Sequence, residues 1–163
     1  SELFLEHYTA NTPGSSVTVV MEGQRPLLFE IQALSVSTSF GYPKRTTSGF
    51  SNSRLQVLLA TLEKRAGVKV SNDDIYLNVA GGFNVKENAA DLSVCIAVAS
   101  AIKNKPVKKG TVAFGEVGLN GEVRRVPQQK RRAKEAKNLG YSNIISPSNV
   151  KNIRQAIKRA LVD

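Results

Sequence analysis

The chain has 163 residues, 41% of them hydrophobic and 22% charged, a composition typical of a single soluble globular domain. No apolar run approaches the roughly 20 residues that a membrane-spanning helix needs, and no signal peptide is recognisable in the first residues. The single cysteine, Cys95, excludes an internal disulfide, and no CxxC pair is present to bind zinc. We therefore expect a cytoplasmic location without membrane contact.

The formal net charge of +10 is unevenly distributed along the chain. Residues 1–102 hold 8 Lys and Arg against 9 Asp and Glu, whereas residues 103–163 hold 15 against 4. A basic field concentrated in the last third of the chain favours a polyanionic partner, nucleic acid above all. The alternative is a surface that only keeps the domain in solution.

The N-terminal part predicts a linker followed by a β-hairpin. Residues 1–16 end in Pro13, Gly14 and two serines, which indicates a linker from an upstream ATPase module, so the domain itself is expected over residues 17–163. Residues 16–22 and 26–37 show the alternation and the β-branched residues of half-buried strands, with a short polar turn between them.

A long loop is expected over residues 38–53, and loops of this length in compact domains are usually functional. It combines aromatic with basic side chains: Phe40, Tyr42, Phe50, Lys44 and Arg45. Two interpretations are open at this point. The aromatic and basic residues can stack on bases and bind phosphates together, or the aromatics fix the loop to the core.

The rest of the chain alternates predicted helices and strands, which indicates a mixed α/β (α+β) fold with one layer of sheet. A helix over 54–65 has leucines on one face, with Asn52 or Ser53 as its cap. The most apolar helix follows Asn88 and Asp91, which are expected to cap its first turn, and it should be buried on most sides. Further strands are expected over 74–80, 111–116, 122–126 and 143–146, and further helices over 128–138 and 150–161, the last capped by Ser148 or Asn149.

The turn before this apolar helix is where α/β proteins often place a nucleophile, but residues 88–91 read Asn-Ala-Ala-Asp. His7, the only histidine, lies in the expected linker, which excludes a Ser-His-Asp or Cys-His site and a histidine-rich metal site. No phosphate-binding G-x-x-x-x-G-K-[ST] motif is present. A Ser-Lys dyad remains the one plausible nucleophilic arrangement, with Ser93 and Ser100 as candidate serines, although both lie on the apolar helix.

The basic segment 124–137 is the strongest positive signal. At 3.6 residues per turn, Lys130, Lys134 and Lys137 share one helix face, and Arg132 lies at its flank. A solvated helix face usually mixes charges of both signs, so contact with DNA phosphates is the better interpretation, without base specificity. The predicted DNA-contacting residues are Arg124, Arg125, Lys130, Arg131, Arg132, Lys134, Lys44 and Arg45. Two further basic clusters are Lys103, Lys105, Lys108 and Lys109, and Lys151, Arg154, Lys158 and Arg159.

Several motifs together resemble a known family. Residues 114–124, FGEVGLNGEVR, are similar to the matching segment of the Lon protease proteolytic domain. The closer resemblance is to the C-terminal Lon-like domain of the RadA (Sms) family of bacterial DNA-repair proteins, and it covers nearly the whole chain. It is carried by MEG at 21–23, EIQAL at 30–34, TSFG at 38–41, LEKRAG at 62–67 and ENAADL at 87–92.

The resemblance implies the Lon fold, which is also that of the second domain of a small-subunit ribosomal protein, without peptidase chemistry. The serine position of Lon falls at Ala89, or at Ala90 if the alignment slips by one residue, and the lysine position falls at Arg132. Arginine stays protonated and cannot act as a base. RadA-type proteins also carry a zinc finger and a RecA-like ATPase core. ATP, magnesium and zinc are therefore implied only for those missing modules, and no cofactor is expected in this chain.

Three functional hypotheses follow. The first is a scaffold and DNA-binding module of a DNA-dependent ATPase that forms a hexameric ring and processes branched recombination intermediates, single-stranded or branched DNA being its partner. The second is a Ser-Lys peptidase. The third is oligomerisation alone, in which the basic residues pair with Glu63, Asp73 and Asp74 of a neighbouring subunit.

Overall fold

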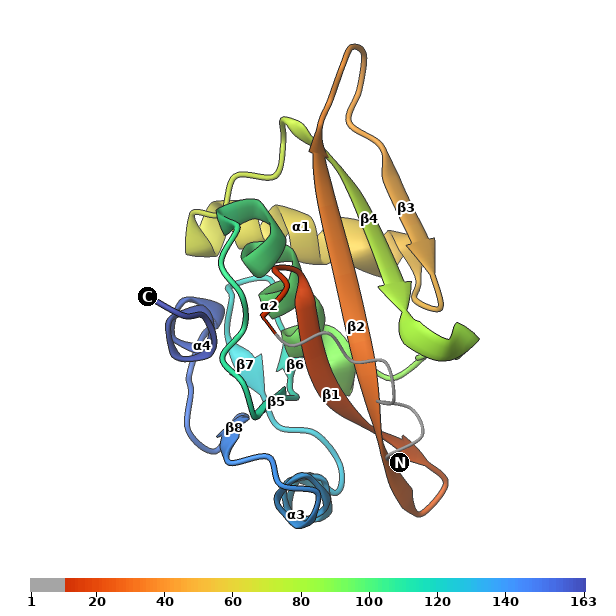
Figure 1. The fold of residues 1–163 in the computed structure, drawn as a ribbon, viewed down its shortest axis with the longest axis vertical. Coiled ribbons are helices and arrows are strands. Elements are labelled where there is room, and N and C mark those ends of the chain that lie inside the picture. The colour runs from red at the N-terminus through yellow and green to blue at the C-terminus, as the bar shows by residue number, and fades with distance from the viewer. Residues whose placement is uncertain (1–10) are drawn as a thin grey trace.

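The computed structural model of the chain describes residues 11–163 and is built on a six-stranded sheet in the order β3–β4–β2–β1–β5–β8 (Figure 1). Strands β1 (Ser15–Glu22), β2 (Arg25–Ser37) and β4 (Asp73–Val79) are antiparallel neighbours. Strands β3 (Arg45–Ser48), β5 (Thr111–Ala113) and β8 (Asn143–Ile145) add to the two sides in parallel. A separate hairpin joins β6 (Glu116–Val117) to β7 (Val123–Arg124). The predicted mixed α/β fold is confirmed.

The domain starts slightly earlier than predicted. β1 already includes Ser15 and Ser16, which the sequence assigned to the linker. The carbonyl of Gly14 also accepts a hydrogen bond from the backbone N–H of Ala33 at 2.7 Å. The last three residues of the expected linker therefore belong to the folded domain, and His7 lies outside the described residues.

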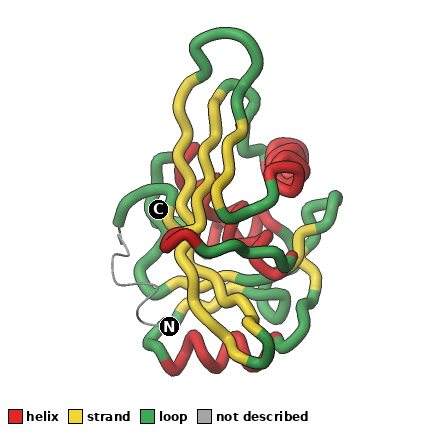
Figure 2. The backbone as a smooth tube through the Cα atoms, turned by 90° about the vertical axis from the view of Figure 1, so that its right-hand side faces the viewer, coloured by secondary structure: helices red, strands yellow, loops and turns green. Residues whose placement is uncertain are grey.

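Helices cover the two faces of the sheet unequally (Figures 1 and 2). Helices α1 (Asn52–Ala66), α2 (Asp91–Lys103) and α4 (Ile153–Ala160) share the larger hydrophobic core with one face. Helix α3 (Gln129–Asn138) packs on the other face, over β1 and β2. On the part of that second face formed by β2 and β4, three large apolar side chains stay exposed: Leu34, Val36 and Tyr76.

Helix α2 is the central packing element, as its apolar sequence predicted. All residues from Asp91 to Ser100 are buried, because the helix is apolar on every side and the sheet and two helices surround it. The expected capping is wrong. Two short 3₁₀ turns, η2 (Ala80–Gly82) and η3 (Asn88–Ala90), lead into α2, and no side chain caps it. Asp91 points inward and binds Arg54 instead.

Two other helix caps also differ from the prediction. Ser51, rather than Asn52 or Ser53, caps α1 by accepting the N–H of Arg54 at 3.1 Å. Asn152 caps α4 by accepting the N–H of Gln155 at 2.9 Å, so this helix begins later than expected. In both cases several capping residues stand close together, and the register that tertiary packing allows decides among them.

The loop after β2 is shorter than predicted because residues 45–48 form β3. Phe40 and Tyr42 are 92% and 93% exposed, so these two rings do not fix the loop to the core, whereas Phe50 does. The base of the loop is held by Asp74, which accepts the Thr38 hydroxyl at 2.9 Å and the Lys44 N–H at 2.8 Å.

Candidate functional site

The turn into α2 holds no nucleophile. Ala89 is 3% exposed and Ala90 is fully buried. Backbone hydrogen bonds close the turn: Gly115 donates to the carbonyl of Ala89 at 2.8 Å, and Leu92 donates to the carbonyl of Gly115 at 3.1 Å. The turn is therefore packed against the strand that follows α2, and neither possible serine position carries a hydroxyl.

Arg132 lies beside this turn although 42 residues separate it from Ala90. Its side chain is 1% exposed and forms an ion pair with Glu87. The guanidinium also donates to the carbonyls of Val19 and Pro127, each at 2.9 Å. Through Glu87, two residues before Ala89, Arg132 is bound to the segment that holds one of the two positions where the resemblance implies a lost dyad. The structure also contradicts the prediction that Arg132 contacts DNA, because a buried guanidinium with all these partners cannot reach a phosphate.

The other candidate serines are part of the core. The Ser93 hydroxyl lies 2.8 Å from that of Ser16 on β1. The Ser100 hydroxyl donates to the carbonyl of Lys105 and accepts the N–H of Gly14. Both serines are fully buried and neither hydroxyl bonds to a lysine amine, so their position does not support a Ser-Lys dyad.

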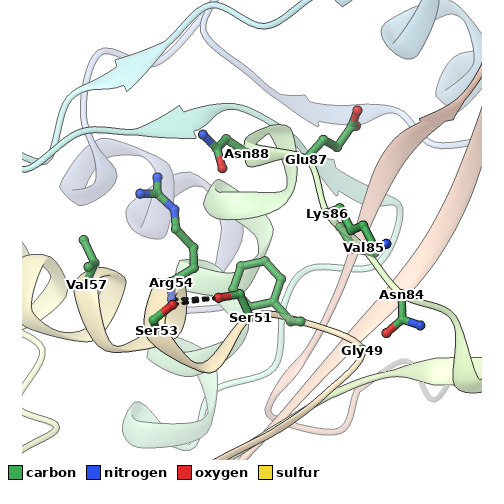
Figure 3. Close-up of a pocket in the computed structure, with 11 residues that line it drawn as sticks. Gly49, Ser51, Ser53, Arg54, Val57, Asn84, Val85, Lys86, Glu87 and Asn88 are labelled. Carbon is green, nitrogen blue, oxygen red and sulfur yellow. Dashed lines mark hydrogen bonds between the residues drawn. The ribbon is translucent and has the colours of Figure 1, made fainter.

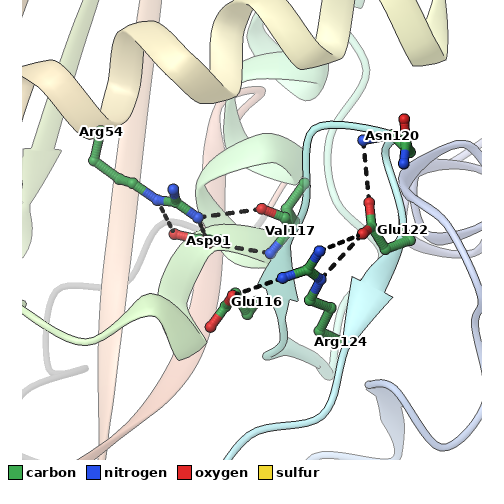
Figure 4. A network of polar contacts seen from close by, with 7 residues as sticks. All are labelled: Arg54, Asp91, Glu116, Val117, Asn120, Glu122 and Arg124. Carbon is green, nitrogen blue, oxygen red and sulfur yellow. Dashed lines mark hydrogen bonds and ion pairs between the residues drawn. The ribbon is translucent and has the colours of Figure 1, made fainter.

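A second buried ion pair fixes α1 and the β6–β7 hairpin to α2 (Figure 4). The carboxylate of Asp91 accepts hydrogen bonds from Nε and Nη2 of Arg54 and, at 3.1 Å, from the backbone N–H of Val117. Arg54 also donates to the carbonyl of Val117. Burial raises the pKa of Asp91, and the hydrogen bonds from Arg54 and Val117 oppose that rise. The hydrogen bond to Asp91 raises the pKa of Arg54. These contacts serve the packing of the domain.

A pocket of about 660 Å³ opens between the start of α1 and the extended segment 84–88 (Figure 3). Arg54 and Val57 line it from α1, and Lys86, Glu87 and Asn88 line it from the opposite side. The backbone N–H of Val85 donates to Gly49 at 2.7 Å and holds the segments together. Sequence reasoning missed this pocket, since its walls come from two distant segments and its lining mixes charges of both signs.

The exposed cations of α3, together with Arg125 shortly before the helix, form what we call the α3 surface: Arg125, Lys130, Arg131, Lys134 and Lys137. The predicted orientation of the helix is confirmed, because Ala136 is buried and Lys130, Lys134 and Lys137 are exposed. Arg131 donates to Gln24 in the β1–β2 turn at 3.0 Å. Within residues 11–163, no cation of the α3 surface forms an ion pair. Glu135 is the one acidic residue between residues 125 and 137, so the surface keeps a positive net charge.

Besides Arg132, three further predicted DNA-contacting residues do not join the α3 surface. Arg124 is exposed but is paired with Glu122 at 2.8 Å and with Glu116 at 3.7 Å (Figure 4). Arg45 donates to the carbonyls of Val70 and Asp73. Lys44 is exposed, yet it directly precedes β3, which lies at the opposite end of the molecule from α3 (Figure 1). The basic residues of the sequence therefore form more than one surface.

The described part of the chain holds neither a cluster of metal-binding side chains nor a membrane-spanning helix. Across residues 11–163, no three His, Cys, Asp or Glu side chains come together as ligands for a metal ion. No helix in the same range is long and apolar enough to cross a membrane.

Known proteins are similar to this chain over most of its length. The chain is 48% identical over 148 residues to the DNA repair protein RadA of Bacillus subtilis, covering 91% of the chain and 32% of the relative. It is 46% identical over 149 residues to the protein of the same name from Streptococcus pneumoniae, with 91% and 36% covered. The chain thus spans about a third of the length of these curated relatives. Residues 36–150 match the family model described as subunit ChlI of Mg-chelatase, and because this is well over half of the chain, the chain belongs to that family.

Proposed function

We propose that this chain is the DNA-binding and assembly module of a larger DNA-repair protein of the RadA type. It would have a Lon-like fold and no peptidase activity. The names of its relatives support the repair role, and they belong to proteins about three times as long. The ATPase that acts on branched recombination intermediates, with its ATP, magnesium and zinc, would then lie in modules outside this chain.

The unpaired charge of the α3 surface is the observation that carries this proposal. Four of its five cations project from α3 and Arg125 directly follows β7, and Glu135 is the one acidic residue between residues 125 and 137. Side chains of this kind bind phosphates and release condensed counterions, so affinity falls as salt rises. Contacts to phosphates carry no sequence information. Binding should therefore depend little on sequence.

A peptidase is less well supported. Ala89 and Ala90 cannot attack a carbonyl group, and Arg132 cannot accept a proton from a nucleophile. Glu87 would further oppose base chemistry at this position, because a neighbouring carboxylate stabilises the charged form of any cation placed there. The buried pair of Arg132 and Glu87 is better explained by a role in packing than by a role in catalysis.

Oligomerisation through the acidic residues named above is also less well supported, although ring formation remains part of the proposal. Glu63 already accepts the N–H groups of Val70 and Ser71, at 2.8 Å and 3.0 Å. Asp74 holds the loop after β2. These carboxylates bond within their own chain, so a neighbouring subunit would compete with those bonds. A ring contact on another surface, such as the exposed apolar side chains of β2 and β4, avoids this competition.

Binding of labelled single-stranded and branched DNA to the chain at several salt concentrations tests the proposal. The double variant Lys130→Glu and Lys134→Glu should bind more weakly and with a salt slope smaller by about two, roughly one for each lost phosphate contact. The matched control is Arg154→Glu with Lys158→Glu, which changes the net charge equally on α4. Equal losses in both variants would mean that the total charge, and not the α3 surface, binds DNA.

A further inference from the structure

Helix α4 borders a second basic site, which the sequence divided between two clusters. A pocket of about 270 Å³ lies where the ends of α1 and α2 meet α4. It is formed because α1 ends at Gly67 in a left-handed conformation, with φ of 69°, and Val68 then turns into the core. Helix α4 packs on the opposite face of the sheet from α3, so this pocket is separate from the α3 surface.

Four exposed cations surround the pocket: Lys103, Lys105, Arg154 and Lys158. None of the four pairs with a carboxylate within residues 11–163, and Asp163 is the one acidic residue in the lining. Four cations against one acidic residue leave the rim with a net positive charge, and the repulsion among the cations falls when an anion binds there. The rim therefore favours a ligand with several negative charges.

The floor of the pocket is apolar. Val68, Ile157 and Leu161 form it and are almost fully buried, and Ala66 and Val162 line its sides. A DNA backbone presents phosphates in a regular row and gains nothing from an apolar floor. The volume is below that of pockets for drug-sized ligands, about 300–1,000 Å³, and suits one side chain that anchors a longer segment.

We propose that this pocket binds an acidic peptide segment of a partner protein, with one apolar side chain on the floor and flanking carboxylates against the four cations. Charge complementarity and the apolar floor both point to this ligand, and neither property belongs to the α3 surface. The proposal is independent of DNA binding. A protein partner would bind beside α4, and nucleic acid would bind the α3 surface.

The probe is a fluorescein-labelled peptide of four aspartates followed by leucine and phenylalanine, and its anisotropy is measured with the chain. Arg154→Glu with Lys158→Glu should weaken binding by about tenfold or more, because two favourable charge contacts become repulsive. Ala66→Leu should weaken binding similarly at unchanged charge, because it fills the pocket from a half-exposed position. Lys130→Glu with Lys134→Glu should leave peptide binding unchanged.

A control peptide with serines in place of leucine and phenylalanine should bind much more weakly than the probe. Absence of probe binding at millimolar concentration would overturn the proposal, as would equal binding to the chain and to its Ala66→Leu variant. A loss of DNA affinity in Arg154→Glu with Lys158→Glu, without a loss of peptide affinity, would show that the pocket serves nucleic acid instead. Circular dichroism of each variant verifies its fold, and Ala66→Met is a milder filling variant if Ala66→Leu unfolds.

Discussion

Lys130 and Arg132 stand two residues apart on α3 and have opposite surroundings. Lys130 is exposed and has no ion pair with any described residue, whereas Arg132 is 1% exposed and bound to Glu87 and to two backbone carbonyls. One residue belongs to a surface that can bind a polyanion, and the other belongs to the core. A basic segment therefore has no single function, and only the burial and the partners of each cation distinguish the two roles.

The largest expected effect is the difference in the free energy of unfolding between alanine variants of these two residues. Arg132→Ala should lower the free energy of unfolding by about 3 kcal/mol, at the lower end for breaking a buried ion pair, because Glu87 stays 29% exposed and can be hydrated. Lys130→Ala should change it by less than about 0.5 kcal/mol. Urea unfolding measures both values. Similar values for the two variants would contradict the assignment of Arg132 to the core.

A smaller effect is expected from releasing a cation that is exposed but paired. Glu122→Gln combined with Glu116→Gln removes both charges that pair with Arg124, which lies next to the α3 surface in sequence. The variant should bind DNA more tightly and with a salt slope larger by about one, because Arg124 becomes available for a phosphate. Leu119→Ser in the same hairpin is the uncharged control. Unchanged binding by the double variant would exclude Arg124 from the DNA surface.

Restoring the missing catalytic groups should give no measurable activity. In the variant with Ala89→Ser, or Ala90→Ser, combined with Arg132→Lys, the new amine would face Glu87. That carboxylate would raise the pKa of the lysine, whereas a general base needs a lowered one. Hydrolysis of a fluorogenic peptide measures the result, with Glu87→Gln added as a further variant. Activity in the variant that retains Glu87 would show that the buried pair does not block catalysis.

The smallest expected effect is a loss, at low pH, of the stability that Asp74 provides by holding the loop after β2. Hydrogen bonds from the Lys44 N–H and the Thr38 hydroxyl lower the pKa of Asp74. A carboxyl whose pKa is lower in the folded state stabilises the fold above its unfolded pKa, about 3.9, and this contribution is lost as the pH falls through the lower folded value. The stability difference between the wild type and Asp74→Asn should therefore shrink below about pH 4. A difference that stays constant into strong acid would contradict this role.

Local patterns were sufficient to predict most of the fold. The all-round apolar sequence of α2 predicted its burial, and the spacing of Lys130, Lys134 and Lys137 predicted an exposed face. The partners of individual residues could not be predicted in this way. A helical wheel places Arg132 at a flank, and only Glu87, 45 residues earlier, decides that it turns inward.

The same limit applies to sites built from several elements. The pocket beside α4 combines the ends of α1 and α2 with α4, so two basic clusters that are separate in sequence become one rim. Arg45 was expected in a loop but lies in β3, where a short pairing with β4 outweighs the polar composition of the segment. Long-range packing determines both outcomes, and no local pattern contains it.

DNA binding through the α3 surface is decided by the salt dependence of binding in three proteins: the wild type, Lys130→Glu with Lys134→Glu, and Arg154→Glu with Lys158→Glu. Binding through this surface predicts that only the α3 variant loses affinity strongly and shows a salt slope smaller by about two. The same slope in the wild type and the α3 variant would contradict it.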